Sequence, residues 1–299
     1  MQGKTSGRLR FAPSPNGLLH LGHAYSALTS AAVARAEGAE LILRIEDIDV
    51  GRCRPEYEIA MLEDLAWLGL IFPEPLRRQS EHMCDYEEVL KRLRAMDLVY
   101  PCFASRREII EAIESSGVGM TRWPRDPDGA PIYPGIYKDM APRELNRLMW
   151  EGRSFAWRLD MEKAIEMAVD LHGGPITFVE EGTGPAGETG EIEAQPELFG
   201  DVLIARKDVP TSYHIAVTHD DALQGVTLVT RGQDLFHSTH VHRLLQVLMG
   251  WPAPRYRHHP LIRDETGRRL SKSARDTGLR ELRQEGMSAD DVRRLIGLE

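Results

Sequence analysis

The 299-residue sequence is poor in cysteine and contains no long hydrophobic run. Its three cysteines, Cys53, Cys84 and Cys102, are odd in number and widely spaced, which argues against a disulfide-stapled secreted fold. No stretch approaches the roughly 18 consecutive apolar residues of a membrane helix, and the polar first ten residues lack the apolar centre of a signal peptide. The sequence therefore predicts a cytoplasmic protein that makes no contact with a membrane.

The net charge of −9 at first argues against a nucleic-acid partner. The charge is unevenly distributed, however. Residues 255–283 contain nine Lys or Arg and four Asp or Glu, whereas residues 164–205 contain nine acidic residues and no Lys or Arg. A local basic segment can contact phosphates even in an acidic protein, but a solvated surface explains the same pattern. Charge alone does not decide between these two interpretations.

Strand-like and helix-like segments alternate along the first hundred residues, as in a parallel sheet with crossover helices. The expected strands and helices are residues 8–12, 21–37, 41–45, 56–68 and 86–96.

The alternation then stops and later resumes. A Gly- and Pro-rich stretch is followed by strand-like residues 154–159 and 176–179 and a glycine-rich loop. Further strands are expected at 202–205, 213–217 and 226–230, before a helix at 240–249. The pattern predicts a doubly wound α/β domain, residues 1–99 and 201–262, interrupted by an α+β subdomain at 100–200.

The tetrapeptide His20-Leu21-Gly22-His23 follows a strand and a turn and opens a helix. The free N–H groups of a helix N-terminus suit a phosphate, and a glycine lets a ligand approach the backbone. The two imidazoles lie on one helix face and could donate hydrogen bonds to a phosphoryl group. A helix cap and a zinc pair are the alternatives, although two histidines without a third ligand make a weak metal site.

A second motif, Arg269-Leu270-Ser271-Lys272-Ser273, lies in a polar loop near the C-terminus. Lys272 offers a point charge for phosphate and the flanking serines offer hydroxyl groups. Basic loops are usually only solvated, so this motif is informative mainly in combination with the histidines.

Together, the two motifs resemble the markers of the class I aminoacyl-tRNA synthetases. Residues 10–17 (RFAPSPNG), 44–49 (RIEDID) and 230–235 (TRGQDL) are more narrowly similar to the glutamyl members of that family. The resemblance spans about residues 10–273 and implies a Rossmann-like doubly wound parallel sheet. It also implies a ligase that uses ATP, with Mg²⁺ bound to the nucleotide.

The resemblance assigns roles to individual residues. It implies that Arg10 and Arg231 bind the carboxylates of L-glutamate and that Glu46 meets its ammonium group. The full expected glutamate site is Arg10, Phe11, Ala12, Pro13, Ser14, Glu46, Tyr213 and Arg231. The expected ATP site is His20, Gly22, His23, Arg269, Leu270, Ser271, Lys272 and Ser273, with His20, His23 and Lys272 as catalytic residues.

The region after the lysine loop predicts the nucleic-acid substrate. Only 26 residues follow Ser273, enough for short helices within 263–299 but not for an anticodon-binding domain. The family includes short paralogues of this size that attach glutamate to the queuosine base at the wobble position of tRNA(Asp). The sequence resembles these most, and a monomer is expected. A compact enzyme that charges tRNA(Glu), a catalytically idle tRNA-binding module and transfer to a carrier protein or small molecule remain alternatives.

The resemblance breaks down at a zinc-binding segment. Related enzymes often have a Cys-x-Cys pair, then a tyrosine and a further cysteine. Here Ala104 stands two residues after Cys102, where the second cysteine would be, and Tyr133 and Tyr137 lie downstream. Two of the four ligands are missing, so a closed site cannot be built. The sequence predicts no zinc and a segment held by aromatic and proline packing, including Trp123.

Overall fold

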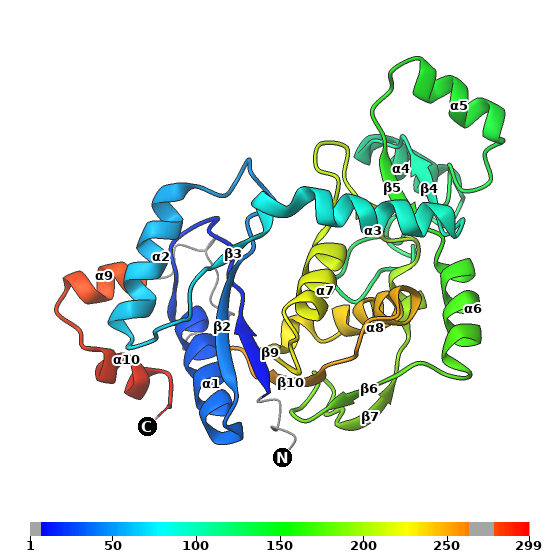
Figure 1. Cartoon of the computed structure of the whole chain (residues 1–299). Coiled ribbons are helices and arrows are strands. Elements are labelled where there is room, and N and C mark those ends of the chain that lie inside the picture. Colours follow the sequence, from blue (N-terminus) through cyan, green and yellow to red (C-terminus); the bar gives the residue numbers. More distant parts are fainter. Residues whose placement is uncertain (1–6, 263–277, 299) are drawn as a thin grey trace.

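The computed structural model describes residues 7–262 and 278–298 (Figure 1). A twisted sheet with helices on its faces forms the body, and a smaller lobe projects from it. The strands are β1 (Arg8–Phe11), β2 (Glu40–Ile45), β3 (Arg77–Arg78), β4 (Val99–Cys102), β5 (Ala156–Leu159), β6 (Thr177–Glu180), β7 (Gly190–Glu193), β8 (Leu203–Ala205), β9 (Leu228–Gly232) and β10 (Arg255–His259). The helices are α1 (Leu21–Glu37), α2 (Pro55–Trp67), α3 (Met83–Ala95), α4 (Arg106–Ser115), α5 (Pro142–Trp150), α6 (Met161–His172), α7 (Tyr213–Leu223), α8 (Ser238–Met249), α9 (Leu279–Gln284) and α10 (Ala289–Leu295).

The first half of the body is a parallel unit. Strand β2 pairs in parallel with β1 on one side and with β3 on the other. Helix α1, which connects β1 to β2, buries small side chains such as Ala24 and Ala27 and ends at Gly38 in a left-handed conformation. The expected strand–helix–strand order of this half is confirmed.

The second half forms a four-stranded sheet of its own with the order β7-β6-β10-β9. Strand β10 pairs in parallel with β9 and with β6, and β7 adds an antiparallel edge. The two halves meet where β9 lies beside β1, because the Thr227 amide donates to the Arg8 carbonyl at 2.9 Å. The mixed α/β fold with a parallel sheet agrees with the sequence prediction.

One expected strand is wrong. Residues 213–217 belong to helix α7, not to a strand. Successive residues Ile215, Ala216, Val217 and Thr218 are all buried. A helix buried on most sides lacks a polar face, so its sequence does not show the helical period.

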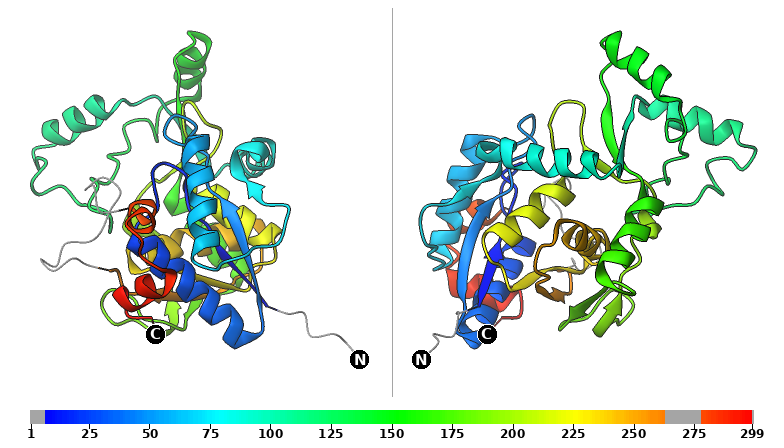
Figure 2. Two further views of the ribbon diagram at one scale, coloured as in Figure 1. Left: turned by 90° about the vertical axis from the view of Figure 1, so that its left-hand side faces the viewer. Right: turned by 45° about the vertical axis from the view of Figure 1, so that its right-hand side comes forward.

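The projecting lobe is the inserted subdomain (Figure 2). Its antiparallel sheet has the strand order β4-β5-β8, and α4 and α5 lie beyond it. Sheet pairing crosses the boundary that the sequence places at residue 200, because β8 pairs with β5 whereas β6 and β7 join the sheet of the second half.

Two short helices end the described chain. Leu279 and Leu282 of α9, with Val292 and Ile296 of the α10 region, share a core with residues of α1 and α2. Among the helices of residues 7–262 and 278–298, none is long and apolar enough to cross a bilayer.

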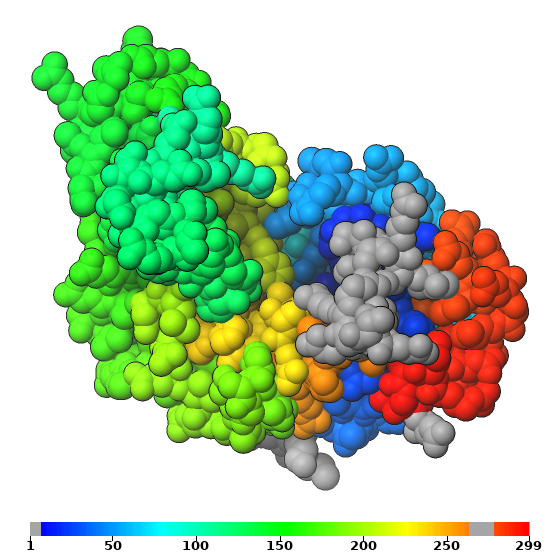
Figure 3. Space-filling model, turned by 180° about the vertical axis from the view of Figure 1, so that it is seen from behind, coloured from blue at the N-terminus to red at the C-terminus, as the bar shows by residue number. Residues whose placement is uncertain are grey.

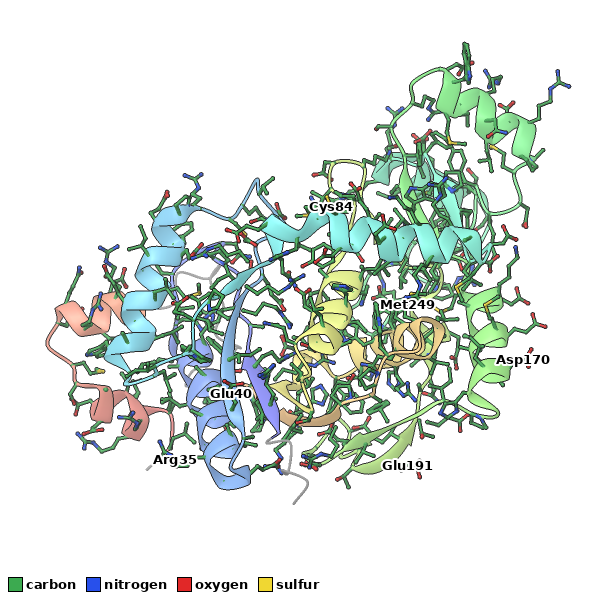
Figure 4. All side chains as sticks on the ribbon, viewed as in Figure 1. Arg35, Glu40, Cys84, Asp170, Glu191 and Met249 are labelled. Carbon is green, nitrogen blue, oxygen red and sulfur yellow. The ribbon has the colours of Figure 1, made fainter. Side chains whose placement is uncertain are left out.

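The acidic segment has charged side chains both on the surface and in the interior, where Glu180 and Asp201 are buried. Asp170 on α6 and Glu191 on β7 are exposed, whereas Met249 at the end of α8 is buried in the core (Figure 4).

Candidate active site

A cleft of about 960 Å³ opens at the carboxyl ends of the parallel strands. Its walls include the residues that follow β1, β2, β9 and β10, together with the start of α1. Ligands bind at this edge in doubly wound sheets because the strand order reverses there. Seen from behind, the molecule is hollowed between the inserted lobe and the N-terminal elements (Figure 3).

The cleft brings together every predicted site residue that lies in the described part of the chain. These are Arg10, Phe11, Ala12, Pro13, Ser14, His20, Gly22, His23, Glu46, Tyr213 and Arg231. Arg269, Leu270, Ser271, Lys272 and Ser273 lie outside the described residues. The two ends of their segment are nevertheless placed, since Ile262 lines the cleft and Gly278 forms a β-bridge with His20.

The two histidines of the first motif cap helix α1. The Gly22 amide donates to His20 Nδ1 at 3.1 Å, and the His20 amide donates to His23 Nδ1 at 3.1 Å. The ring centroids are 3.9 Å apart. Because each Nδ1 accepts a backbone N–H, the Nε2 atom of each neutral ring carries the proton. The helix-cap interpretation and the phosphate interpretation are therefore compatible: the caps orient two Nε2–H donors.

The position of the His20 ring leaves no room for a side chain at residue 22, so glycine is needed there. A Cβ atom at residue 22 would lie 2.9 Å from His20 Cε1 and 3.1 Å from His20 Nδ1. Any larger residue would displace the ring from its capping position.

Arg10 and Glu46 belong to a buried network of four charged residues. Arg10 Nε donates to Asp221 Oδ1 at 3.1 Å, Arg44 Nη1 donates to the same oxygen at 2.7 Å, and Arg44 Nη2 donates to Glu46 Oε1 at 2.9 Å. Burial raises the pKa of Glu46, and Arg44 and Arg10 offset this effect only in part. Burial also acts to raise the pKa of Asp221, but Arg10 and Arg44 hold it below its usual value.

Arg231 is surrounded by neutral acceptors. Its Nε donates to His258 Nε2 at 3.0 Å, its Nη2 donates to Thr239 Oγ1 at 2.7 Å, and its Nη1 lies 3.3 Å from His242 Nδ1. The Tyr213 hydroxyl is 3.5 Å from Nη1. The side chain is 4% exposed, and no carboxylate of the described residues forms an ion pair with it. A buried guanidinium without a counter-ion favours an anionic ligand.

The neighbouring histidines are neutral. Burial lowers the pKa of His214 and of His258 to about 4 and lowers that of His242 well below its usual value. The nearby Arg231 charge acts in the same direction on all three.

The sequence alone did not identify most of the residues that form hydrogen bonds or ion pairs around Arg10 and Arg231. Asp221, His242 and Glu180 were not singled out, and His214 directly follows the predicted Tyr213. The pair Asp220-Asp221 becomes informative once residues 213–223 are a helix, because a buried acidic pair in a helix requires cationic partners.

The basic segment at residues 255–283 is partly neutralised. Arg255 and Arg257 both pair with Glu37 and Glu181, and Arg283 pairs with Glu63. These three arginines are therefore engaged within the protein. Arg280 is exposed, so in the described part of this segment it is the better candidate for a phosphate contact.

The zinc-like segment is a packed aromatic cluster. Cys102 Sγ donates to the Tyr133 hydroxyl at 3.4 Å, and the same oxygen accepts the Tyr137 amide at 3.0 Å. Trp123 Nε1 donates to the Ile132 carbonyl at 2.7 Å. Within the part of the chain that the structure describes, no three His, Cys, Asp or Glu side chains are placed to hold a metal ion.

Residues 7–296 match the family model "tRNA synthetases class I (E and Q), catalytic domain". The chain belongs to this family. A curated relative from Rhodobacter capsulatus, named glutamyl-Q tRNA(Asp) synthetase, is 45% identical over 97% of this chain and 99% of its own length. A relative of the same name from Nocardia farcinica is 35% identical over 96% of this chain and 82% of its own length. Glutamate–tRNA ligase 2 of Nitrosococcus oceani is 36% identical, but the chain spans 57% of that protein.

Solved structures agree with the family. The crystal structure of glutamate-tRNA synthetase from Elizabethkingia anophelis matches with a TM-score of 0.70 and 26% identity, over 94% of this chain and 54% of that one. The chain thus spans about half of that enzyme. The predicted resemblance, the class I fold and the enzyme class, a ligase of the tRNA synthetase type, are confirmed.

Proposed function

We propose that this chain activates L-glutamate with ATP and transfers the glutamyl group to the queuosine base at the wobble position of tRNA(Asp). Nearly full-length similarity to relatives named glutamyl-Q tRNA(Asp) synthetase supports this proposal. The observation that carries the choice of an acidic amino acid is Arg231, a buried cation that lines the cleft and whose described hydrogen-bond partners are neutral.

Glutamate fits the polarity of the cleft. One carboxylate pairs with Arg231, whose planar guanidinium can donate two parallel hydrogen bonds. The ammonium group meets Glu46, whose charge Arg44 and Arg10 compensate only in part and which thereby gains a further cation. Arg10 and Ser14 also line the cleft, and Arg10 is expected to help orient the other carboxylate.

ATP fits the part of the cleft at the start of α1. Gly22 makes room for the His20 ring that caps the helix, and His20 and His23 supply Nε2–H donors for a phosphate. Mg²⁺ bound to ATP would neutralise phosphate charge. A carboxylate oxygen of glutamate attacks the α-phosphorus, the bond to the β-phosphate oxygen breaks, and pyrophosphate leaves with the electron pair. His20, His23 and Lys272 stabilise the charge that develops on the phosphate oxygens.

The second step is an acyl transfer. A hydroxyl of the queuosine cyclopentenediol attacks the adenylate carbonyl, an ester forms, and AMP leaves. Arg280 and the adjoining lysine loop supply positive charge for the tRNA backbone. The proposed substrates, ATP and tRNA, place this reaction in the cytoplasm.

The deciding experiment is transfer of radiolabelled glutamate to three RNAs: tRNA(Asp) with queuosine, tRNA(Asp) without it, and tRNA(Glu). Label is expected only on the queuosine-containing tRNA. It should persist when the 3′-terminal adenosine of that tRNA has been removed, because the base and not the 3′ end is the acceptor. Label on tRNA(Glu) that is lost with its terminal adenosine would instead identify a compact aminoacylating enzyme.

A further inference from the structure

A chain of buried hydrogen bonds connects Arg231 to Glu180, a residue that the proposed chemistry does not use. Arg231 Nε donates to His258 Nε2 at 3.0 Å, and the opposite ring atom, His258 Nδ1, lies 2.5 Å from Glu180 Oε2. The side chains of His258 and Glu180 are both completely buried. Two residues far apart in sequence thus meet on adjacent strands, β6 and β10.

The direction of this chain is fixed by the chemistry of arginine. A guanidinium only donates, so His258 Nε2 must be the unprotonated acceptor. The proton of the neutral ring is then on Nδ1, where Glu180 accepts it. A carboxylate at residue 180 therefore selects the histidine tautomer that can hold Arg231.

Glu180 is itself held by the backbone. Its Oε1 accepts the amides of His258 and Gly182, both at 2.8 Å. A Cβ at residue 182 would lie 2.3 Å from the His258 carbonyl oxygen, so only glycine allows this close approach. The two amides leave Oε2 as the single oxygen that faces the imidazole.

A second arm holds the other side of the guanidinium. Arg231 Nη1 lies 3.3 Å from His242 Nδ1, and His242 Nε2 lies 3.3 Å from His214 Nδ1. The same donor rule makes His242 an acceptor toward Arg231 and a donor toward His214. Both arms therefore require neutral histidines, and in neither arm does a carboxylate contact the Arg231 guanidinium directly.

We propose that Glu180 and His258 are positioning residues that fix the plane of the Arg231 guanidinium and thereby set the preference for glutamate over glutamine. This proposal rests on the proposed function. A fixed guanidinium presents only donors and one positive charge. A carboxylate accepts both donors, whereas the amide of glutamine places its own N–H₂ against one of them. If the guanidinium could rotate, it would escape that clash and the preference would fall.

The variant Glu180→Gln tests the proposal without removing volume. Two backbone amides continue to require an oxygen at the Oε1 position, so the new N–H₂ group faces His258 Nδ1. His258 must then accept at Nδ1 and carry its proton on Nε2, opposite the Arg231 Nε–H. The expected result is a KM for glutamate about tenfold higher, with kcat much less affected, which is the size of one lost hydrogen bond to a charged group. The ratio of kcat/KM for glutamate to that for glutamine should fall by a similar factor.

The matched control is Glu181→Gln, the same change at the next residue. Glu181 pairs with Arg255 and Arg257 and does not line the cleft. Glutamate-dependent ATP–pyrophosphate exchange is measured for both variants. If Glu180→Gln and Glu181→Gln behave alike in KM and in amino-acid preference, the positioning role is wrong.

A measurement on the unmodified protein keeps the test independent of variant folding. Nitrogen-15 NMR of the labelled histidines should show His258 as the Nδ1–H tautomer, and the Nε2–H tautomer would overturn the proposal. If the proposed function is wrong, the experiments give a different result from the one expected if only the positioning role is wrong. In that case the unmodified protein shows no glutamate-dependent exchange, while the tautomer of His258 still reports on its contact with Arg231.

Discussion

Gly278 forms an antiparallel β-bridge with His20, and the Leu279 amide donates to the Leu19 carbonyl at 2.8 Å. The chain that leaves β10 at the rim of the cleft therefore returns to the histidine motif. The intervening residues include Lys272. Anchoring both ends of this segment at the cleft is the physical basis for expecting Lys272 to reach the same phosphate as His20.

We expect Lys272→Ala to slow glutamyl-adenylate formation by about 100-fold, because it removes one charge that stabilises the transition state. The KM for glutamate should change much less. Steady-state ATP–pyrophosphate exchange at varied glutamate measures both quantities. Lys91→Ala is the control, because Lys91 is an exposed partner of Glu88 on α3. A large rise in KM with an unchanged rate would contradict the phosphate role.

We expect Gly22→Ala to lower the rate of ATP–pyrophosphate exchange without lowering the thermal stability of the protein. The added methyl group meets the His20 ring at 2.9 Å, so the imidazole must move and the exchange rate should fall at least tenfold. Alanine favours helix by about 1 kcal/mol relative to glycine, so the thermal midpoint should not collapse. Gly51→Ala, at an exposed position where a Cβ meets only Asp49 Oδ1 at 3.6 Å, is the matched control. Full activity of Gly22→Ala would show that the ring position does not matter.

Arg231→Ala should raise the KM for glutamate about 100-fold, since it removes a charged partner of a carboxylate. The comparison is Arg35→Ala, an exposed arginine at the far end of α1 (Figure 4). Isothermal titration with glutamate gives the affinity directly. Equal affinities for the two variants would exclude Arg231 from the amino-acid site.

Stability should fall as the pH decreases from about 6.5 toward 4. Burial lowers the pKa of His240 to about 4, and the neighbouring His237 charge adds to this effect. The unfolded chain then binds a proton in this interval that the folded chain does not, so acid favours unfolding. Urea unfolding of His240→Gln should show a slope of the unfolding free energy against pH that is smaller by about 1 kcal/mol per pH unit. The exposed His172→Gln variant should keep the original slope, and an unchanged slope in His240→Gln would count against a neutral buried ring.

The sequence predicted the first half of the fold closely because its signals are local. Helix 21–37 has the observed bounds of α1, since its small apolar residues, a capping histidine and a terminal glycine mark both ends. Helix 56–68 differs from α2 by a single residue at each end. Periodicity and capping are contained within a few turns of chain, so they can be read without tertiary information.

The surroundings of the arginines were not predictable in the same way. Asp221 is 211 residues from Arg10, and Glu180 is 78 residues from His258. Such contacts depend on which strands pair, and β6 pairs with β10, from which it is separated in sequence by β7, β8, α7, β9 and α8. The positive charge of an arginine could suggest an anionic ligand for Arg231, but the sequence could not show that neutral histidines accept hydrogen bonds from its guanidinium.

The bridge between the two halves has a consequence for how the protein is made. Arg10 leaves the ribosome early, yet Asp221, Thr230 and Arg231 follow more than 200 residues later. At 5–20 residues per second this delay is on the order of 10–40 seconds. Arg10 and Arg44 are buried beside Asp221 in the folded protein, but during synthesis they lack this shared counter-ion until residue 221 has been added. The residues proposed to bind the amino acid can therefore meet only after β9 has been synthesised, and we expect a chain that stalls before β9 not to bind glutamate.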